Sequence, residues 1–473
     1  MKKFACFLFA CLFLLTMSCS GKDVVAEQTD VETETVAKDM YGYEFIFKAM
    51  TDYETFFFPA PVSSAYGDKI LSRYAQTAEK FDCIVNVEAA VPTIQSLLVG
   101  AAASGEKYAD LVDTDAYTIY QDIDYFMPLN DFAGFDLEDP KWGPKGYLET
   151  AKFNGANYGF IAYNWGVPYP QYIGNLFFMP SVMAEFELPN PQELYEQKSW
   201  TWDKFKEYST KMTVTGATPE ENRYGFVISN EMKFPRAFIL SNGGNAITFD
   251  ETQNKYIYGL NDPKAQQALQ YIKDMLDQGI GYFTKGDDWQ KSALMFKEKK
   301  TGFFEAFNKN CFVTGELFLS DGLDEDYAWV PYPNGPIGTY GTSTAQFWCT
   351  ARFLGVVNNS LDEDELENNS ILINYIFSPL EGETAESWKD MVKRRFFFDD
   401  LSFKYYIELF EGGTTDFSAV AYNSVWIDIP NVYRQIFNGT KSVGESVQGI
   451  TDKVNAELDK LINPYLEGNS SEE

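Results

Sequence analysis

The sequence of 473 residues contains no histidine. Histidine titrates nearest to neutral pH, is the commonest general base and is a frequent ligand of zinc. Its absence excludes catalysis by Ser-His-Asp or Cys-His arrangements and zinc sites built on histidine. Acidic residues do not occur at the alternating spacing of a calcium-binding loop either. We therefore expect neither a metal nor another cofactor.

Cysteine is scarce, with six in the whole chain and no two at C-x-x-C spacing. Three of them lie in the body of the chain, namely Cys83, Cys311 and Cys349. Scattered cysteines of this kind are most often small buried hydrophobic residues. A disulfide between Cys311 and Cys349 is permitted in an oxidising compartment, and the spacing alone leaves it open.

Positive charge is also in deficit, because 38 Lys and Arg face 69 Asp and Glu and give a net charge of −31. Such a surface repels the phosphates of nucleic acids and of anionic lipids. We expect no nucleic-acid partner, and we interpret the acidity as solubility outside the cell. Hydrophobic residues make up 45% of the chain, enough for the cores of two or more domains.

Long apolar runs are missing except at the N-terminus, where residues 4–15 follow Lys2 and Lys3. This run is too short for a stable membrane span and predicts a secretory signal. With small residues before Cys19, the stretch 1–18 resembles a bacterial lipoprotein signal peptide, which implies lipidation of Cys19. Residues 19–42 are polar and acidic, and we expect a flexible tether there. The alternative is ordinary secretory cleavage nearby, with Cys19 as an incidental thiol.

From Tyr43 onward, short apolar runs alternate with segments of helical spacing. Because strands that alternate with helices are joined by crossovers, the pattern predicts a mainly parallel sheet in an α/β domain. Strands are expected at 43–50, 83–87 and 109–113, and helices at 68–81, 92–103 and 115–126.

In such a sheet, ligands bind beyond the carboxyl ends of the strands. Tyr53, Glu54 and Phe57 follow the first strand, and Asp113 and Asp115 follow the third. We therefore expect these residues to line a pocket. Asp115 is about equally well explained as the N-cap of the next helix, and Tyr53 and Phe57 as core residues.

The second half of the chain begins after an aromatic and glycine-rich stretch at 154–165, interpreted as a crossover into a second domain. Thr201 is expected to cap one helix, and Asp262 another that starts with Pro263 and ends at Gly279. A further strand is expected from Thr301 to Phe307, with Phe304 and Glu305 at its end.

Three later segments complete the pattern. Residues 335–343 are rich in glycine and small polar residues, and they are interpreted as a second crossover or as a plain exposed loop. Residues 361–407 are typical of helices. Apolar residues that recur every three or four positions over 443–462 predict one final amphipathic helix.

Several motifs occur in a recognisable order: WTWDKF at 200–205, RYGF at 223–226, SNGGN at 241–245, MFKEKKTGFFEAF at 295–307 and WVPYPNGP at 329–336. In this order they resemble the extracellular solute-binding proteins of carbohydrate ABC importers. The resemblance implies an α/β, two-lobed periplasmic-binding-protein-like fold with a ligand cleft between the lobes. The family's common F-x-x-G-K-x-A-M pattern lacks its usual glycine here, at 296–302.

The expected division of the chain gives the N-terminal lobe residues 43–155 plus 290–343. The C-terminal lobe then comprises residues 156–289 plus 344–473. Aromatic rings in such a cleft stack on sugar rings, while carboxylates and amides bind the hydroxyls. The candidate ligand-binding residues are Tyr53, Glu54, Phe57, Asp113, Asp115, Trp165, Asn242, Gly243, Phe304, Glu305 and Trp348.

The resemblance implies capture of a sugar or oligosaccharide by lobe closure and its delivery to the transmembrane subunits of an ABC permease, without chemistry. The protein would act as a monomer, lipid-anchored to the outer face of the bacterial cytoplasmic membrane. The alternative is an extracellular glycoside hydrolase, which needs two carboxylates and no histidine. A peptide- or metal-binding lipoprotein is disfavoured, since the chain lacks the residues for metal coordination.

Overall fold

The structure is a computed structural model in which the chain divides between Lys38 and Asp39. No helix within the described part is long and apolar enough to cross a membrane. The described residues are 38–50, 57, 66–90, 94–132, 134–153, 155–166, 172–218, 221–229, 232–284, 289–305, 326–342, 344–347, 351–359, 362–415 and 428–464.

The first lobe is built on a four-stranded sheet in the order β15-β3-β1-β2. Its strands are β1 (Tyr43–Met50), β2 (Cys83–Ala90), β3 (Leu111–Asp115) and β15 (Arg352–Val356). The three N-terminal strands pair in parallel, as the α/β pattern predicts, and β15 joins β3 antiparallel. The first strand has the expected bounds, and the third lies two residues later than expected.

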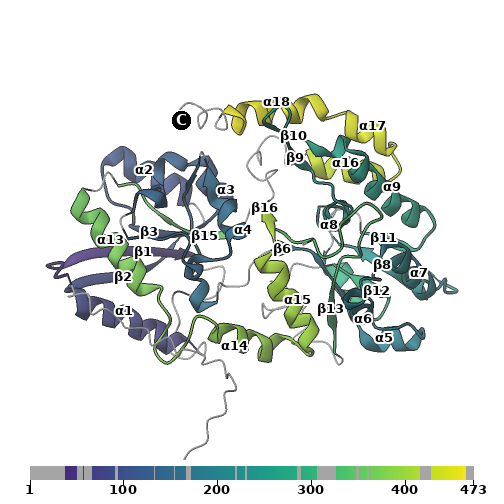
Figure 1. The fold of residues 1–473 in the computed structure, drawn as a ribbon, viewed down its shortest axis with the longest axis horizontal. Coiled ribbons are helices and arrows are strands. Elements are labelled where there is room, and N and C mark those ends of the chain that lie inside the picture. Colours follow the sequence, from purple (N-terminus) through teal and green to yellow (C-terminus); the bar gives the residue numbers. More distant parts are fainter. Residues whose placement is uncertain are drawn as a thin grey trace, which may run out of the picture. The chain divides into compact units, whose positions relative to one another are not determined.

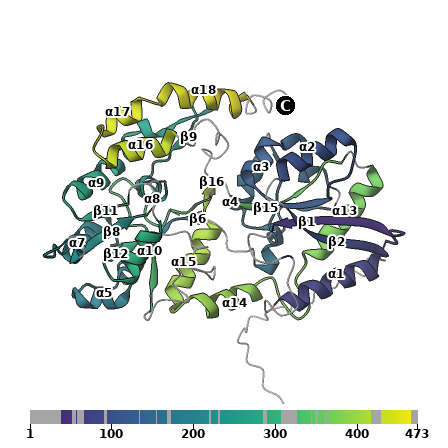
Figure 2. The same ribbon diagram turned by 180° about the vertical axis from the view of Figure 1, so that it is seen from behind.

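Helices cover both faces of this sheet. They are α1 (Gly67–Phe81), α2 (Ile94–Ser104), α3 (Ala116–Gln121) and α13 (Glu363–Ile376). Figures 1 and 2 show α1 and α2 on opposite sides of the strands. Helices α1 and α13 are far apart in sequence and lie side by side, because Arg73 of α1 donates hydrogen bonds to the carbonyls of Tyr375 (2.7 Å) and Ser378 (3.3 Å).

The second lobe is built on a five-stranded sheet in the order β11-β8-β12-β7-β13. Its strands are β7 (Asn175–Phe178), β8 (Tyr224–Ile228), β11 (Gly281–Phe283), β12 (Thr301–Phe304) and β13 (Ala328–Pro331). Strands β7, β12 and β13 are buried along their whole length, in agreement with their mostly apolar sequences.

The expected division into lobes differs from this strand pairing. Strands β12 and β13 fall within 290–343, which was assigned to the N-terminal lobe, yet both pair with β7 of the second sheet. Strand β15 falls within 344–473, which was assigned to the C-terminal lobe, yet it pairs with β3 of the first sheet. Periodicity in the sequence predicts whether a segment is a helix or a strand. It does not indicate with which sheet a strand pairs, so the pairing of β12, β13 and β15 could not be predicted from it.

Helix caps in the second lobe follow the sequence closely. Thr201 accepts a hydrogen bond from the Lys204 amide, and Asp262 caps the helix that begins with Pro263, as predicted. The helices are α5 (Pro180–Glu185), α6 (Pro191–Glu196), α7 (Trp202–Met212), α8 (Lys233–Ser241), α9 (Pro263–Asp277) and α10 (Trp289–Lys297).

The C-terminal helices are α14 (Ser387–Phe396), α15 (Asp400–Glu411), α16 (Asp428–Phe437), α17 (Val443–Gln448) and α18 (Thr451–Leu461). The prediction of a single helix over 443–462 is therefore wrong, because the helix ends at Gln448 and a second helix begins at Thr451. Figure 1 shows α18 beside the hairpin β9 (Ile247–Asp250) and β10 (Lys255–Tyr258). Asn455 and Asn463 accept hydrogen bonds from the Tyr258 and Tyr256 amides of that hairpin, each at 2.8 Å.

A third, small sheet joins the paths that the chain takes between the lobes. Its strands β6 (Tyr172–Ile173), β14 (Gln346–Phe347) and β16 (Thr414–Thr415) have two residues each, in the order β16-β14-β6. Strand β6 precedes β7 of the second sheet, and β14 lies between β13 and β15, where the chain returns to the first. Residues 335–342, interpreted as a second crossover or as an exposed loop, are still held to the second lobe, because the Gly335 amide donates to the Ser241 carbonyl at 2.9 Å and the Tyr340 hydroxyl to the Tyr195 carbonyl at 3.1 Å. The chain passes to the first sheet after this segment.

Candidate functional site

Asp113 lies in the middle of β3 and not after the strand, where it was expected, and it forms a buried ion pair with Arg352, the first residue of β15. The Oδ1 atom of Asp113 lies 2.5 Å from Nη2 and 3.1 Å from Nε of Arg352. Asp113 is only 4% exposed, and a buried carboxylate is costly unless it is paired. Tyr147 donates a hydrogen bond to the Arg352 carbonyl at 3.0 Å and holds the same strand in place.

Asp115 acts as a helix cap in this structure. Its side chain accepts a hydrogen bond from the Thr118 amide at 2.8 Å at the start of α3. The N-cap role is one of the two explanations open from the sequence. A contact between Asp115 and a ligand stays a prediction.

Phe57 and Trp165 are brought together, but in the core of the first lobe. Their ring centroids lie 6.4 Å apart, and both pack on Phe377. Trp165 is 1% exposed and donates its indole N–H to the Ser378 carbonyl at 3.0 Å. With the ring faces covered, the observed role of both residues is packing.

At the carboxyl end of β12, Glu305 is 2% exposed and lies against the end of β8. The Ser229 hydroxyl donates to the Glu305 carbonyl at 2.9 Å and approaches its Oε2 at 3.2 Å. Thr284, after β11, donates to the Ile228 carbonyl at 2.9 Å. These polar groups therefore meet where three neighbouring strands end, which is the edge expected to bind a ligand.

Aromatic residues of α8 pack beside this polar edge. Tyr332 packs on Phe234 and Phe238, with ring centroids 5.8 and 5.3 Å apart. Burial, and after it the negative charge of Glu305, raises the pKa of Tyr332 well above its ordinary value, so its phenol is neutral at physiological pH. Phe304 is buried beneath, with Phe296 at 5.3 Å.

Asn242 and Gly243 lie at the end of α8 and not at a strand end. Asn242 is fully buried and donates to the Lys264 carbonyl (2.9 Å) and to the Gln267 Oε1 (3.0 Å). Its own Oδ1 accepts from the Ile337 amide at 3.1 Å. Gly243 has φ +75°, which confirms the predicted turn. Their observed roles are structural, and ligand contact stays a prediction.

The remaining candidates Tyr53, Glu54 and Trp348 lie outside the described residues, as do Cys19, Cys311 and Cys349. Cys83 is buried, as predicted, and burial, followed by the charge of Asp82, raises the pKa of its thiol to about 11. Sequence reasoning missed Arg352, Ser229 and Tyr332. Arg352 carried a usable signal, since a cation that opens an apolar strand needs a buried partner.

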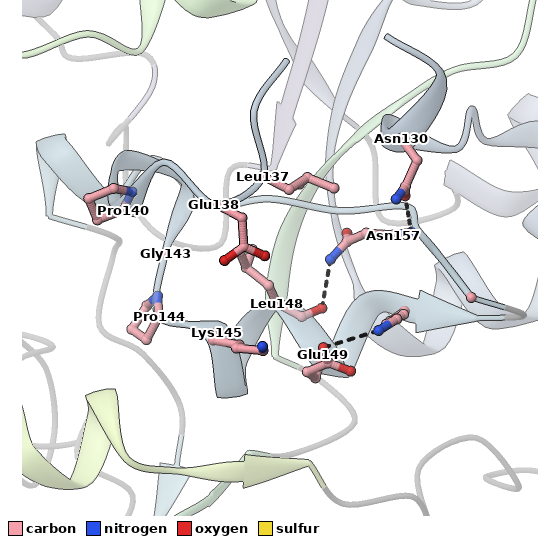
Figure 3. A pocket seen from close by; sticks show the side chains of 12 residues that line it. Asn130, Leu137, Glu138, Pro140, Gly143, Pro144, Lys145, Leu148, Glu149 and Asn157 are labelled. Atoms are coloured by element: carbon pink, nitrogen blue, oxygen red, sulfur yellow. Dashed lines mark hydrogen bonds and ion pairs between the residues drawn. The ribbon is translucent and has the colours of Figure 1, made fainter.

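A separate pocket of about 320 Å³ lies in the first lobe, beside α4 (Lys145–Leu148). Figure 3 shows Glu138, Lys145 and Asn157 among its lining side chains, and Asn157 donates to the Leu148 carbonyl at 3.0 Å. None of the predicted site residues lines it, so we do not assign the sugar site to it.

Two α/β lobes whose sheets are connected through very short strands define a bilobed binding protein. The sequence profile of bacterial extracellular solute-binding proteins matches residues 72–381, and the chain belongs to this family. It is a family of binding proteins that work outside the cytoplasm. No curated protein matches the chain by sequence.

Solved structures share the fold at low sequence identity. The sugar-binding protein MalE of Xanthomonas citri is 15% identical, with a TM-score of 0.59 over 88% of this chain and 98% of its own. The GacH receptor of Streptomyces glaucescens, solved unliganded and with acarbose, is 15% identical, with a TM-score of 0.57 over 88% and 99%. The binding protein Lmo0181 of Listeria monocytogenes, solved with cycloalternan, is 13% identical, with a TM-score of 0.56 over 88% and 99%.

Proposed function

We propose that the protein captures a sugar or an oligosaccharide outside the cell and delivers it to the transmembrane subunits of an ABC permease. The observation that carries this proposal is the small sheet of β6, β14 and β16. Connections of two residues per strand confine a rotation between lobes to a few backbone positions, which is what hinge closure requires. A ligand that contacts both lobes then favours the closed state.

The sugar class is supported by the chemistry at the strand ends and by the solved relatives. Ser229 and Glu305 provide a hydroxyl and a carboxylate at the edge of the second sheet. We assign further contacts to Tyr53 and Glu54 beyond β1 and to Trp348 after β14, where aromatic rings and a carboxylate suit sugar faces and hydroxyls. Acarbose and cycloalternan, bound by two of the relatives, are both carbohydrates.

The attachment to the cell is part of the same proposal. Residues 1–18 are a lipoprotein signal peptide, Cys19 carries the lipid, and a flexible tether follows it. The tether predicted for 19–42 is too long at its end, because Met40 is buried and its amide donates to the Phe81 carbonyl at 2.8 Å. The protein acts as a monomer without catalysis, since its task is to release the solute unchanged to the permease.

Thermal unfolding of residues 39–473 against a panel of mono- and oligosaccharides tests the proposal. A ligand at about 100 times its dissociation constant stabilises by roughly 2.7 kcal/mol, which is a readable shift in Tm. Each mixture is afterwards analysed for cleavage products. A shift with intact sugar supports transport, a shift with hydrolysis replaces it by a glycoside hydrolase, and no shift across the panel removes the sugar class.

A further inference from the structure

A second polar groove runs along helix α9 of the second lobe. Two hollows of about 630 and 640 Å³ share Gln267 and Gln270 and together follow one face of the helix. We call it the α9 groove and define it by Pro263, Gln266, Gln267, Gln270, Tyr271 and Asp274.

The groove residues of α9 lie on one face of the helix because of their spacing in the sequence. The six residues recur every three or four positions and therefore form one stripe of roughly 16 Å. The opposite face, with Ala268, Leu269 and Ile272, is buried against the lobe. A stripe of this length accommodates an extended chain of several sugar rings better than a single ring.

The walls of the groove come from segments distant in sequence. The start of α7 contributes Thr201 and Asp203, and the turn with Asn334 stands beside them. Ser442, at the start of α17, lines the other hollow, and α17 contacts α9 (Figure 1). Trp202 and Tyr271 stack at 4.6 Å and 20°, with the Tyr271 hydroxyl donating to the Trp202 carbonyl at 2.6 Å.

The buried Asn242 sets this arrangement. Its amide nitrogen binds the Oε1 of Gln267, and its oxygen accepts from the Ile337 amide in the wall. Because Oε1 of Gln267 already accepts a hydrogen bond from Asn242, the side-chain N–H groups of Gln267 are the donors that can bind a ligand. Asn242, in the sequence motif at 241–245, thus orients Gln267 and Ile337 in the lining of the α9 groove.

The chemistry of the lining suits an uncharged polyhydroxylated ligand. Gln267 offers N–H donors, while Gln270 donates to Asp274 at 2.7 Å and keeps its own oxygen as an acceptor. Asp203 and Asp274 add carboxylate acceptors. Hydroxyl groups both donate and accept, so they match this mixture. No lysine or arginine occurs among the described residues that line the two hollows, which disfavours an anionic ligand.

We propose that the α9 groove is a second carbohydrate-binding site, which holds the distal part of a long, neutral oligosaccharide. The assignment deepens the proposed function, on which its ligand class rests. It would raise the local concentration of a long chain at the protein, which is an effect of avidity rather than of a tighter cleft.

The test uses residues 39–473 labelled with 5-fluorotryptophan and titrated with maltodextrins and cellodextrins of two to about eight sugar units. The ¹⁹F signal of Trp202, assigned with the variant Trp202→Phe, reports on the groove directly. The double variant Gln270→Ala/Asp274→Ala removes an exposed pair that bonds to itself, so the fold is retained. The matched control Lys273→Ala/Asp277→Ala removes the exposed i,i+4 ion pair off the groove on the same helix.

We expect long chains, and not disaccharides, to shift the Trp202 signal. We also expect the groove variant to weaken binding of the long chains about tenfold, with the control variant unchanged. If short sugars stabilise the protein while the Trp202 signal never moves and both variants bind long chains like wild type, the groove proposal is overturned and the cleft proposal stands. If the Trp202 signal moves and the groove variant abolishes all sugar binding, including every sugar-induced shift in Tm, the groove is the only site, so the cleft proposal falls and the groove stands. No response to any sugar overturns the ligand class of both.

Discussion

Gly146 of α4 and Gly413 after α15 pack backbone against backbone. A methyl group added at Gly146 would lie 2.1 Å from the Gly413 carbonyl oxygen, and one added at Gly413 would lie 2.5 Å from the Phe347 ring of β14. Tyr147, next in α4, packs on the same Phe347 at 4.7 Å. The small sheet between the lobes therefore packs closely on α4, through the two glycines and the Tyr147–Phe347 ring pair, and the pocket of Figure 3 lies beside that helix.

We predict that Gly146→Ala destabilises the protein by about 1–3 kcal/mol, because the methyl group meets a backbone oxygen that has no rotamer to escape into. Urea unfolding at neutral pH measures the effect. The matched control is Gly100→Ala in α2, where nothing lies within 4 Å, and it should be neutral or stabilise by about 0.4–1 kcal/mol. Equal stability of the two variants would contradict the close packing.

The Asp113–Arg352 ion pair gives a second prediction. Asp113→Asn leaves the buried guanidinium without its carboxylate and should cost about 3–5 kcal/mol in the free energy of unfolding. Glu149→Gln removes a partner from the exposed pair with Lys152 (3.3 Å) and should cost below about 1 kcal/mol. Chemical denaturation of both variants measures the difference. If Asp113→Asn lowers the free energy of unfolding no more than Glu149→Gln does, the ion pair does not stabilise the pairing of β3 with β15.

The sequence predicts features whose cause is local. Thr201 and Asp262 cap their helices as expected, because a cap depends on a few adjacent residues. The break after Gln448 was missed since the apolar spacing continues through it from Val443 to Ile462. The sheet that β15 joins was also missed, because pairing between distant strands leaves no trace in periodicity.

The candidate site was predicted less completely for the same reason. Strand β12 ends at Phe304, beside Glu305, as predicted, but the neighbour Ser229 lies 76 residues earlier in the sequence. That this edge binds a ligand stays a prediction. Arg352 reaches Asp113 across 239 residues. Asn242 was singled out for its polar motif, yet burial and three hydrogen bonds within the second lobe explain it. Sequence pattern therefore finds the edge, while tertiary contacts decide which side chains remain for a ligand.

A pH dependence follows from Glu196 of α6. The side-chain hydrogen bond from Lys404 (3.0 Å), opposed by partial burial and assisted by Tyr405 (3.0 Å), lowers the pKa of Glu196. A lowered pKa in the folded state stabilises above the unfolded pKa of about 4.3, and this contribution disappears as pH falls through the folded value. Glu196→Gln should therefore be less stable than wild type at pH 7 and converge with it below about pH 4.

Urea unfolding at several pH values between 3 and 7 follows this difference. The size is expected to be small, since both partners are substantially exposed and salt screens them. Glu251→Gln, in an exposed turn, is the control and should track wild type throughout. A gap between Glu196→Gln and wild type that stays constant down to pH 3 would argue against the ionised Glu196 as its source.

The last prediction separates packing from ligand contact at two tryptophans. Trp165→Phe removes the indole bond to Ser378 and part of a buried ring, so we expect a loss of about 1–3 kcal/mol in stability with sugar affinity unchanged. Trp348→Ala, in the proposed cleft, should instead weaken sugar binding about tenfold, or roughly 1.4 kcal/mol. Calorimetric titration, with the sugar that shifts the Tm of wild type, measures both variants below their unfolding temperatures. A tenfold loss of affinity in Trp165→Phe with normal stability would instead place Trp165 against the ligand in the bound state, and the core packing would then have to open on binding.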